Sequence, residues 1–503
     1  MVSDSTRPVR PPRTPLATVA RWLGDWADVE VRGEGPGVEV TGISLSSQRV
    51  RSGDLYAALP GARAHGIEFA AAAVAAGAVA VLTDPAGAAA GAPGVPLLVV
   101  DRPRQVLGRL AARIYGDPAR SMRMVGVTGT QGKTTTTRLL EGGLEQAGVP
   151  AAVIGTVGTR VAGEDVRSTL TTPEAPDLHG LFAMMCERGV EACAMEVSSH
   201  ALVMGRVDGV VFDTAVFLNL GRDHLDFHRD VEDYFAAKAS LFTPGRARLG
   251  LVNVDDAHGR RLVDEATVPI RTFSAAGADA DWRAVDVVLR AEGSEFTVVA
   301  PDGSRIPAAC PLPGDFNVAN TLAAVAAAGE AGLGAAAVAA GIATSGGVPG
   351  RLERVDAGQD FVVVVDYAHK PDAVEAAIRT LRPLTDGRVI VVLGAGGDRD
   401  PGKRPIMAEI AARLADLLVV TDDNPRTEDP ASIRAAMLAG VRSGEAVEVG
   451  DRREAIREAV RRAAPGDIVL IAGKGHETGQ EVAGVVHPFD DREVVREEIA
   501  CLR

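Results

Sequence analysis

Short apolar segments alternate with helical stretches through the middle of the chain. The strand candidates between residues 121 and 348 are Met124–Thr128, Ala151–Ile154, Ala192–Glu196, Thr214–Leu218 and Leu249–Val254. Apolar strands separated by helices are typical of a parallel sheet with crossover helices. We therefore predict an open parallel sheet in this region, with active residues at the carboxyl ends of its strands.

The same alternation restarts at Pro349. The strand candidates are Phe361–Val365, Val389–Leu393, Leu417–Thr421 and Ile468–Ala472, and the helix candidates are Ala373–Arg382, Ile406–Ala415 and Arg453–Ala464. Each strand runs into a polar segment, and these segments are Asp366–Asp372, Gly394–Pro405, Asp422–Asp429 and Gly473–Glu477. Four polar loops at one edge of a parallel sheet indicate a second domain that binds a substrate.

The N-terminal part of the chain predicts a smaller α/β domain. Short segments occupy Trp22–Leu59, a helix is expected at Glu68–Ala76, and strands are expected at Val79–Leu82 and Leu97–Val100. The first 16 residues are rich in Pro, Arg and Ser and lack the apolar core of a signal peptide, so we expect a disordered tail. The predicted fold class is α/β with three domains, at residues 17–118, 119–348 and 349–503, the last being Rossmann-like.

Composition narrows the class of function. A length of 503 residues fits about three domains. The formal net charge of −14 argues against nucleic acid or an anionic membrane as the main partner. The four cysteines show no Cys-x-x-Cys spacing, and the longest apolar run, residues 69–82, is too short to span a bilayer. We expect a soluble, cytoplasmic monomer with reduced thiols that acts on small molecules.

The segment Met124–Arg138 has the features of a phosphate-binding loop. An apolar strand leads into a Gly/Thr loop that ends in Gly132, Lys133 and Thr134, and a helical run follows. In such a loop, backbone N–H groups and the helix N-terminus face phosphate oxygens, the lysine reaches the outer phosphates and a hydroxyl reaches Mg²⁺. Val127 stands where the standard pattern has glycine, which argues against an ordinary transport ATPase or GTPase. We predict ATP as the ligand.

Two polar clusters follow strands of the central sheet, at Glu196–His200 and at Asn219–His228. A magnesium–nucleotide site needs carboxylates or other hard ligands beside the phosphate loop, and Glu196 with His224 or Asp223 would supply them. For either cluster alone, helix caps and satisfied polar turns are the favoured explanation, whereas both clusters together after a phosphate loop favour a site. The two histidines of the second cluster lack a third ligand for zinc.

Lysine is scarce in this chain. Only five of the 53 basic residues are lysine, namely Lys133, Lys238, Lys370, Lys403 and Lys474. Codon bias alone would scatter them, yet each lies in one of the segments singled out here. Lysine differs from arginine because it is a compact point charge whose amine can lose its proton and react. Lys238, in the amphipathic helix predicted at Tyr234–Phe242, is therefore either a surface lysine or a reactive amine.

Taken together, these segments resemble the Mur ligases, the ATP-dependent amide-forming enzymes of peptidoglycan precursor synthesis. The resemblance rests, in chain order, on Gly126–Thr134, Glu196–His200, Asn219–His228, Tyr234–Phe242, Gly314–Asn320, Asp366–Asp372, Asp423–Arg426 and Gly473–Glu477. Within the family, Asp423–Arg426 (Asp-Asn-Pro-Arg) is similar to the motif of the members that add meso-2,6-diaminopimelate to UDP-N-acetylmuramoyl-L-alanyl-D-glutamate. The resemblance implies such a ligase, working through an acyl phosphate.

The resemblance also implies roles for individual residues. ATP phosphates are expected at Gly129, Thr130, Gln131, Gly132, Lys133, Thr134 and Thr135, and other nucleotide contacts at Asn320, Arg351 and Asp366. Mg²⁺ is expected at Thr134, Glu196, His224 and Lys238, the last carbamylated by CO₂ into a carboxylate-like ligand; Lys133, Glu196, His224 and Lys238 are the expected catalytic residues. UDP-sugar contacts are expected at Leu45, Ser47, Thr171, Thr172, Ser198 and Arg206, and amino-acid contacts at Arg399, Asp423, Asn424, Pro425, Arg426, Gly473 and Glu477.

The charges of the C-terminal motif suit one amine substrate. Arg426 can grip the distal carboxylate of diaminopimelate bidentately, while Glu477 takes its distal ammonium. L-lysine lacks that carboxylate, so Arg426 would face nothing. Without the family context, capping of an Ala-rich helix explains Asn317 and Asn320 better than binding of a nucleotide base or ribose does.

Three positions depart from the family pattern. Gln131 replaces the usual asparagine of the phosphate loop, Met204 stands where a polar UDP-sugar contact is expected, and the Arg63 loop, Gly61–His65, differs in sequence. The alternative functions are the same ligase with L-lysine as its substrate, a folylpolyglutamate synthetase or another Mur ligase, and a nucleotide-binding regulator without catalysis.

Overall fold

A computed structural model describes residues 6–33, 35–91, 94–166 and 170–502. The chain forms two compact units. The first comprises Met1–Arg283, Val299–Ser304 and Leu322–Gly341, and the second comprises Ala284–Val298, Arg305–Thr321 and Ile342–Arg503. The first unit holds both the N-terminal and most of the central α/β region, so the domain limits expected from sequence remain predictions.

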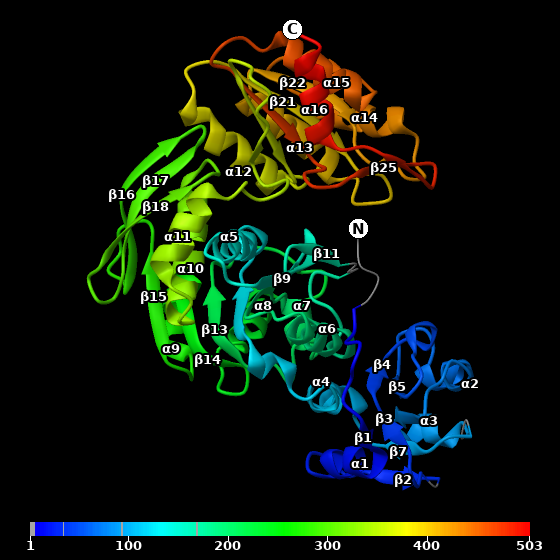
Figure 1. The fold of residues 1–503 in the computed structure, drawn as a ribbon. Helices are drawn as coiled ribbons and strands as arrows, with labels where there is room; N and C mark the ends of the chain where they lie inside the picture. The colour runs from blue at the N-terminus through cyan, green and yellow to red at the C-terminus, as the bar shows by residue number, and fades with distance from the viewer. Residues whose placement is uncertain (1–5, 34, 92–93, 167–169, 503) are drawn as a thin grey trace. The chain divides into compact units, whose positions relative to one another are not determined.

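The N-terminal part of the first unit is built on a five-stranded sheet of order β2-β7-β6-β5-β4 (Figure 1). Its elements are α1 (Leu16–Gly24), β2 (Glu30–Arg32), β3 (Glu39–Val40), β4 (Gly42–Ser44), β5 (Asp54–Ala58), α2 (Ala70–Ala75), β6 (Ala80–Thr83), α3 (Pro85–Ala89), β7 (Leu97–Val99) and α4 (Pro103–Ile114). The helix expected at Glu68–Ala76 is divided into a 3₁₀ turn, Gly66–Phe69, and the short α2.

The N-terminal tail is ordered from residue 6 onward, which corrects the expectation of a disordered tail over residues 1–16; residues 1–5 lie outside the described residues. Arg7 is buried and donates from Nη1 to both carboxylate oxygens of Asp54, at 2.9 and 2.6 Å. The backbone N–H groups of Val9 and Arg10 each donate to the Glu187 carboxylate at 2.7 Å. Strand β1 (Thr14–Pro15) then pairs with β3. A polar composition did not predict this order because a buried ion pair holds the tail.

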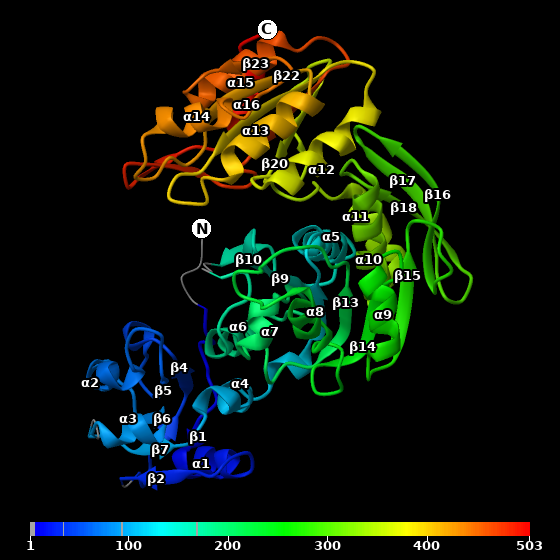
Figure 2. The ribbon, with the colours of Figure 1, turned by 180° about the vertical axis from the view of Figure 1, so that it is seen from behind.

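The central sheet confirms the predicted parallel arrangement. Strands β9, β12, β8, β13, β14 and β15 lie side by side in that order, each parallel to its neighbour. The elements are β8 (Arg123–Thr128), α5 (Lys133–Gln146), β9 (Ala151–Gly155), β10 (Gly158–Val161), β11 (Glu164–Val166), α6 (Ala175–Glu187), β12 (Ala192–Glu196), α7 (Ser199–Val203), β13 (Phe212–Phe217), α8 (Val231–Ala239), β14 (Ala247–Asn253), α9 (Ala257–Glu265) and β15 (Ile270–Ser274). Helix α5 packs against β9 and β12 (Figures 1 and 2). Strands β8, β9, β12 and β13 are almost entirely buried because a parallel sheet is covered on both faces.

Strand β16 (Trp282–Arg290) begins in the first unit, parallel to β15, and is followed in sheet order by β17 (Gly293–Val299) and β18 (Arg305–Cys310). Helices α10 (Asp315–Glu330) and α11 (Ala335–Thr344) complete this stretch of chain. The Ala-rich helix expected after Gly314 is therefore present.

The second unit contains the second predicted sheet, of order β19-β20-β24-β21-β22-β23, parallel from β20 to β23. Its elements are β19 (Glu353–Arg354), β20 (Val362–Asp366), α12 (Pro371–Leu381), β21 (Val389–Ala395), α13 (Lys403–Leu414), β22 (Leu417–Asp422), α14 (Pro430–Leu438), β23 (Ala446–Glu448), α15 (Arg452–Arg462), β24 (Ile468–Ala472), β25 (Gly479–Val482), β26 (Val485–Pro488) and α16 (Asp491–Ala500). The four polar segments follow β20, β21, β22 and β24, so their starts share one edge of the sheet.

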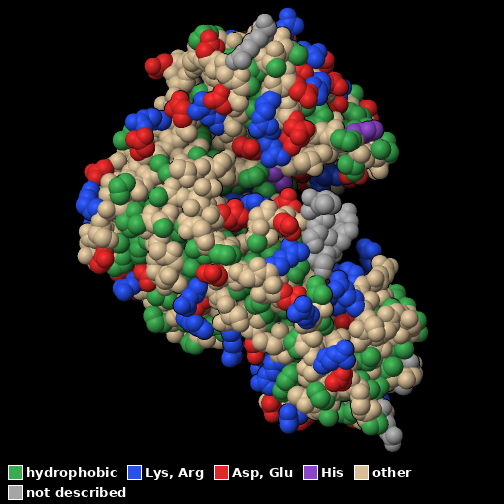
Figure 3. Space-filling model, viewed as in Figure 1, with side chains coloured by type: hydrophobic (Ala, Val, Ile, Leu, Met, Phe, Trp, Pro, Cys, Tyr) green, Lys and Arg blue, Asp and Glu red, His purple; other side chains and the backbone are tan. Residues whose placement is uncertain are grey.

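Acidic and basic side chains are interspersed on the face of the molecule shown in Figure 3. Among the described residues, every helix is too short or too polar to cross a lipid bilayer.

Candidate active site

The predicted phosphate loop connects β8 to α5, and left-handed glycines shape it. Gly132 has φ of +86° directly before the first residue of α5, a conformation that side chains other than glycine rarely adopt. Asn219, after β13, holds the loop from outside, because its Oδ1 accepts the N–H groups of Thr130 at 3.1 Å and Gln131 at 3.0 Å. Lys133 donates from Nζ to the carbonyl oxygens of Gly129 and Thr130, at 2.8 and 3.1 Å. The N-terminus of α5 and the Lys133 ammonium thus lie at the same loop, and both attract an anion.

Glu196 ends strand β12 beside this loop and is buried. Its Oε1 accepts Thr134 Oγ1 and Thr156 N, both at 2.8 Å, and its Oε2 accepts Thr156 Oγ1 at 3.1 Å. Gly155 makes room for the carboxylate, since a Cβ at that position would lie 2.4 Å from Oε1. The site therefore fixes one carboxylate against the hydroxyl of the phosphate loop.

This pair of oxygen donors suits Mg²⁺. Mg²⁺ is usually held by one or two carboxylates together with substrate phosphates, rather than by an all-protein cage. Within the described residues there is no group of three or more His, Cys, Asp and Glu side chains placed to hold a metal ion. Thr134 and Glu196 thus fit an ion that arrives with a nucleotide.

Lys238 of α8 reaches the same loop from the opposite side. Its side chain is only 1% exposed, and Nζ donates to the Gly129 carbonyl oxygen at 2.8 Å and lies 3.4 Å from Thr128 Oγ1. Nζ also lies 4.7 Å from the centre of the Tyr234 ring. Burial, and then the nearby charge of Lys133, hold the pKa of Lys238 well below its usual value. Lys238 is therefore a buried amine that readily becomes neutral, which excludes the surface-lysine interpretation.

His224 lies in the loop after β13 with φ of +55°, an uncommon value for a non-glycine residue. Its ring packs edge-on against His200, with centroids 4.9 Å apart, and against Tyr234, with centroids 6.1 Å apart. The Tyr234 hydroxyl lies 3.2 Å from Thr130 Oγ1, so Tyr234 connects this histidine to the phosphate loop. Burial and the neighbouring His228 lower the pKa of His200.

Four residues expected to contact a UDP-sugar come together around the end of β12. Thr171 Oγ1 lies 3.2 Å from Thr156 Oγ1, and Thr172 Oγ1 donates to the Glu196 carbonyl oxygen at 2.8 Å. Ser198 caps α7, and Arg206 Nη1 donates to the Thr172 carbonyl oxygen at 3.3 Å.

The remaining expected UDP-sugar residues belong to the N-terminal sheet. Leu45 follows β4, and Ser47 begins the 3₁₀ turn Ser47–Arg49. Within the described residues, neither makes a hydrogen bond to the four residues around β12. Arg63 is exposed, and Met204 Sδ accepts Arg206 Nη2 at 3.4 Å.

In the second unit, the Asp-Asn-Pro-Arg segment packs against a β-hairpin formed by β25 and β26. Asn424 Nδ2 donates to Glu477 Oε2 at 2.9 Å, so two of the expected amino-acid contacts touch. Arg426 has φ of +54°, and its Nη1 donates to the Gly397 carbonyl oxygen at 2.7 Å. Arg426 Nε lies 3.5 Å from Glu481 Oε2.

Two of the other expected contacts of the second unit adjoin each other, since a Cβ at Gly473 would lie 2.6 Å from Asp423 Oδ2. Asp423 is buried, and Pro425 lies between Asn424 and Arg426 in the sequence. Gly473 follows β24 with φ of +117°. Arg399 is exposed in the loop after β21.

The expected nucleotide contacts of the second unit are Asn320, Arg351 and Asp366. Asp366 accepts the N–H groups of Leu352 at 2.7 Å and Ala368 at 2.8 Å, and burial raises its pKa. The Arg351 guanidinium lies 4.8 Å from the centre of the Tyr367 ring. Asn320 Nδ2 donates to Asn317 Oδ1 at 3.1 Å within α10.

Three residues that hydrogen-bond to the expected site residues were not predicted from the sequence. Thr156 binds Glu196 through both its N–H and its hydroxyl, and Asn219 binds the phosphate loop. Lys474 Nζ contacts both Asn424 and Glu477. The scarcity of lysine was a signal for Lys474 and the second polar cluster was a signal for Asn219, whereas nothing in the sequence distinguished Thr156.

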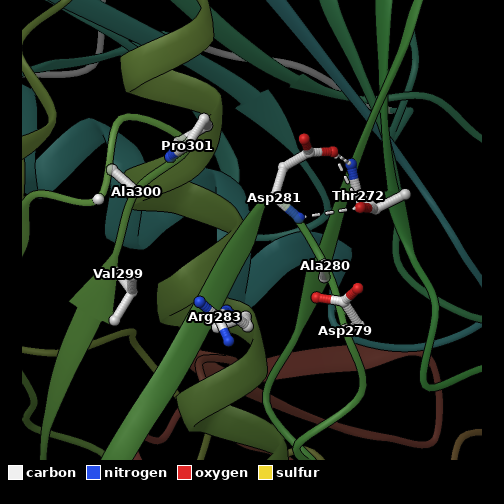
Figure 4. A pocket seen from close by; sticks show the side chains of 9 residues that line it. Thr272, Asp279, Ala280, Asp281, Arg283, Val299, Ala300 and Pro301 are labelled. Carbon is white, nitrogen blue, oxygen red and sulfur yellow. Dashed lines mark hydrogen bonds between the residues drawn. The ribbon is translucent and has the colours of Figure 1, made fainter.

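A separate surface pocket lies in the first unit (Figure 4). Its lining comprises Thr272, Asp279, Ala280, Asp281, Arg283, Val299, Ala300, Pro301 and Gly303. Asp281 Oδ2 accepts the N–H and the hydroxyl of Thr272, at 2.8 and 2.9 Å. None of these residues was among the expected site residues.

Comparison with known proteins agrees with this geometry. The Mur ligase middle domain matches residues 127–328, the glutamate ligase domain of Mur ligases matches residues 350–475, and the catalytic domain of the Mur ligase family matches residues 39–115. ATP-using ligases of this family thus share all three regions of the chain.

Individual relatives match over nearly the whole length. The UDP-N-acetylmuramoyl-L-alanyl-D-glutamate–2,6-diaminopimelate ligase of Streptomyces coelicolor is 58% identical over 98% of both chains. The ligase of that name from Corynebacterium efficiens is 51% identical over 92% of this chain and 90% of its own. A solved structure of a ligase with the same name superposes with a TM-score of 0.71 at 36% identity, covering 94% of this chain and 97% of the other. The chain belongs to the Mur ligase family.

Proposed function

We propose that this chain is an ATP-dependent ligase that joins meso-2,6-diaminopimelate to UDP-N-acetylmuramoyl-L-alanyl-D-glutamate. The observation that carries the amine specificity is the hydrogen bond from Asn424 to Glu477 in the second unit, which ties Glu477 to the Asp-Asn-Pro-Arg segment that bears Arg426. The cation of Arg426 and the anion of Glu477 complement the two charges at the far end of diaminopimelate. The names of the relatives support the same substrate pair.

The reaction balances as two transfers. The γ-phosphoryl group of ATP passes to the terminal carboxylate of the acceptor, which gives an acyl phosphate and ADP. The amine then attacks the acyl carbon, inorganic phosphate leaves with the bonding electron pair, and the amine loses a proton. Lys133 and the N-terminus of α5 offset the charge that develops on the transferred group. Gly129–Thr135 are the proposed phosphate contacts.

Mg²⁺ would be held by Thr134 and Glu196, with His224 and Lys238 nearby in the same site, and it would neutralise charge on the nucleotide phosphates. Before the metal binds, Thr134 and Thr156 keep the Glu196 carboxylate fixed. This arrangement lowers the cost of organising the site. In this proposal Thr156 holds the Glu196 carboxylate and is not itself a ligand of the metal ion.

We also propose that Lys238 is carbamylated. The neutral amine attacks CO₂, a C–N bond forms, and one proton is released, which turns the neutral amine into an anionic carbamate. The depressed pKa of Lys238 supports this step because only the unprotonated amine is nucleophilic. Mass spectrometry of the intact enzyme after trapping of the carbamate would show the added CO₂, and an unmodified Lys238 in the active enzyme would contradict it.

Two further parts of the proposal concern the whole chain. Residues 17–118 would bind the uridine nucleotide, residues 119–348 would bind ATP, and residues 349–503 would bind the amino acid. Asn320, Arg351 and Asp366 would contact ATP. The enzyme would be cytoplasmic, because all its proposed substrates are small water-soluble molecules, and it would act as a monomer. Light scattering on the purified chain tests the oligomeric state.

The decisive experiment measures phosphate release and product mass with ATP, Mg²⁺ and the UDP-linked dipeptide, adding either meso-diaminopimelate or L-lysine. We expect turnover with diaminopimelate and at most a small fraction of it with lysine. Turnover with lysine alone would keep the ligase but refute the specificity. No turnover with either amine would refute the proposed reaction.

A further inference from the structure

Lys474 is a buried cation that the proposed reaction does not use. Its side chain is 0% exposed, and Nζ lies within hydrogen-bond distance of three acceptors. These are Asn424 Oδ1 at 3.1 Å, Glu477 Oε2 at 3.3 Å and the Gly479 carbonyl oxygen at 2.6 Å. An ammonium group carries three N–H donors, so every donor has an acceptor.

This environment explains why the chain keeps a lysine at position 474. Arginine would bring five donors on a larger planar group into a space with three acceptors, and buried donors without acceptors are costly. Only five of the 53 basic residues are lysine, so position 474 has a lysine in a chain whose basic residues are otherwise nearly all arginine.

The contacts of Lys474 set the orientation of two side chains. Asn424 Oδ1 accepts both Lys474 Nζ and the Glu481 N–H, the latter at 2.9 Å, so the amide must turn its Nδ2 toward Glu477. Glu477 Oε2 in turn receives both Asn424 Nδ2 and Lys474 Nζ. Within the described residues, Glu477 Oε1 has no hydrogen-bond partner, so it is the oxygen left for a ligand.

We propose that Lys474 is a positioning residue for amine specificity. It acts through Asn424 and Glu477, and it holds Glu477 with one oxygen tied to the protein and the other directed to the distal ammonium of the amino-acid substrate. This inference rests on the proposed function. It adds that recognition of the ammonium depends on a side chain that does not itself contact the substrate.

The test compares two substrates that differ by this ammonium, meso-diaminopimelate and L-2-aminopimelate, which keeps the distal carboxylate. For Lys474→Met we expect kcat/KM with diaminopimelate to fall 10- to 100-fold, mainly through KM, and kcat/KM with 2-aminopimelate to fall less than 3-fold. The KM for ATP should stay within 2-fold. Arg413→Met removes an exposed cation of α13 that pairs with Glu409, and it should change none of these values by more than 2-fold.

A second background shows whether Lys474 acts through Glu477. In Glu477→Gln, the added Lys474→Met change should cost diaminopimelate less than 3-fold, because the carboxylate it positions is gone. Lys474→Gln, which removes the charge but keeps N–H donors, replaces Lys474→Met if the latter does not fold by circular dichroism, and it should show the same substrate difference.

Equal losses with both amines, a rise in the KM for ATP, or full additivity with Glu477→Gln would each overturn the positioning role. An inactive wild-type enzyme with diaminopimelate would instead refute the proposed function, so the two failures are distinguishable.

Discussion

Arg426 offers the sharpest test of the substrate assignment. Its guanidinium carries five N–H donors, of which one is used by the Gly397 carbonyl oxygen and one, on Nε, faces Glu481. Three donors remain, which is enough to grip a carboxylate bidentately. The backbone of Arg426 is held independently, since its N–H donates to the Glu481 carbonyl oxygen at 3.0 Å. Replacing the side chain should therefore leave the loop in place.

The expected cost follows from those contacts. A hydrogen bond to a charged group is worth about 1.5 to 3 kcal/mol. The Arg426 side chain is 23% exposed, so two such bonds at the lower end of this range give about 3 to 4 kcal/mol. That free energy corresponds to about a 10²- to 10³-fold loss in kcat/KM.

The assay is phosphate release by Arg426→Met with each amine. We expect the full loss with meso-diaminopimelate, little change in the slow rate with L-lysine, and an unchanged KM for ATP. Arg379→Met serves as a control, because Arg379 is exposed on α12 and forms a local ion pair with Glu375. Equal losses with both amines, or an effect confined to ATP, would refute the assignment of Arg426 to the distal carboxylate.

Three further predictions concern the first unit. Lys238→Met should abolish turnover without rescue by bicarbonate. Compared with wild-type protein kept free of CO₂, so that Lys238 is an unmodified amine, the variant should have a higher melting temperature at neutral pH. The depressed pKa of that amine makes wild-type stability rise with pH up to the ordinary lysine value, and this slope should flatten in the variant. An active variant would remove Lys238 from the site. Burial lowers the pKa of His179 from 6.5 to about 4, so on acidification the unfolded chain takes up the proton before the folded chain does. About 3 kcal/mol of stability is therefore lost as the pH falls from 6.5 to about 4. Urea unfolding of His179→Gln should show a smaller loss over this pH range, and a pH profile identical to that of the wild type would contradict the prediction. Gly155→Ala places a Cβ 2.4 Å from Glu196 Oε1, so it should lower kcat at least 10-fold and raise the Mg²⁺ concentration required for activity. Gly245→Ala serves as the control, because a Cβ there meets no atom within 4 Å, and it should leave activity unchanged. Equal activities of the two variants would show that the position of Glu196 is not critical.

The predicted strands and helices were largely correct because their signal is local. The strand expected at Ala192–Glu196 has those limits in the structure, and Ile468–Ala472 does as well. The main error concerned the first 16 residues, where a polar composition suggested disorder. Arg7 is held by Asp54, 47 residues away in the sequence, and no local pattern reports such a contact.

The two parallel sheets, the phosphate loop and the polar segments at strand ends can all be predicted from the sequence, because hydrophobic periodicity and glycine spacing act over a few residues. The rarity of lysine is also visible in the sequence. What those lysines do depends on long-range contacts, which exist only in the folded chain. Lys238 meets the carbonyl of Gly129 across 109 residues, and Lys474 meets Asn424 across 50. Such contacts depend on how sheets and helices pack. Burial then lowers the pKa of Lys238. The surroundings of Lys474 supply three acceptors for the three N–H donors of its ammonium group.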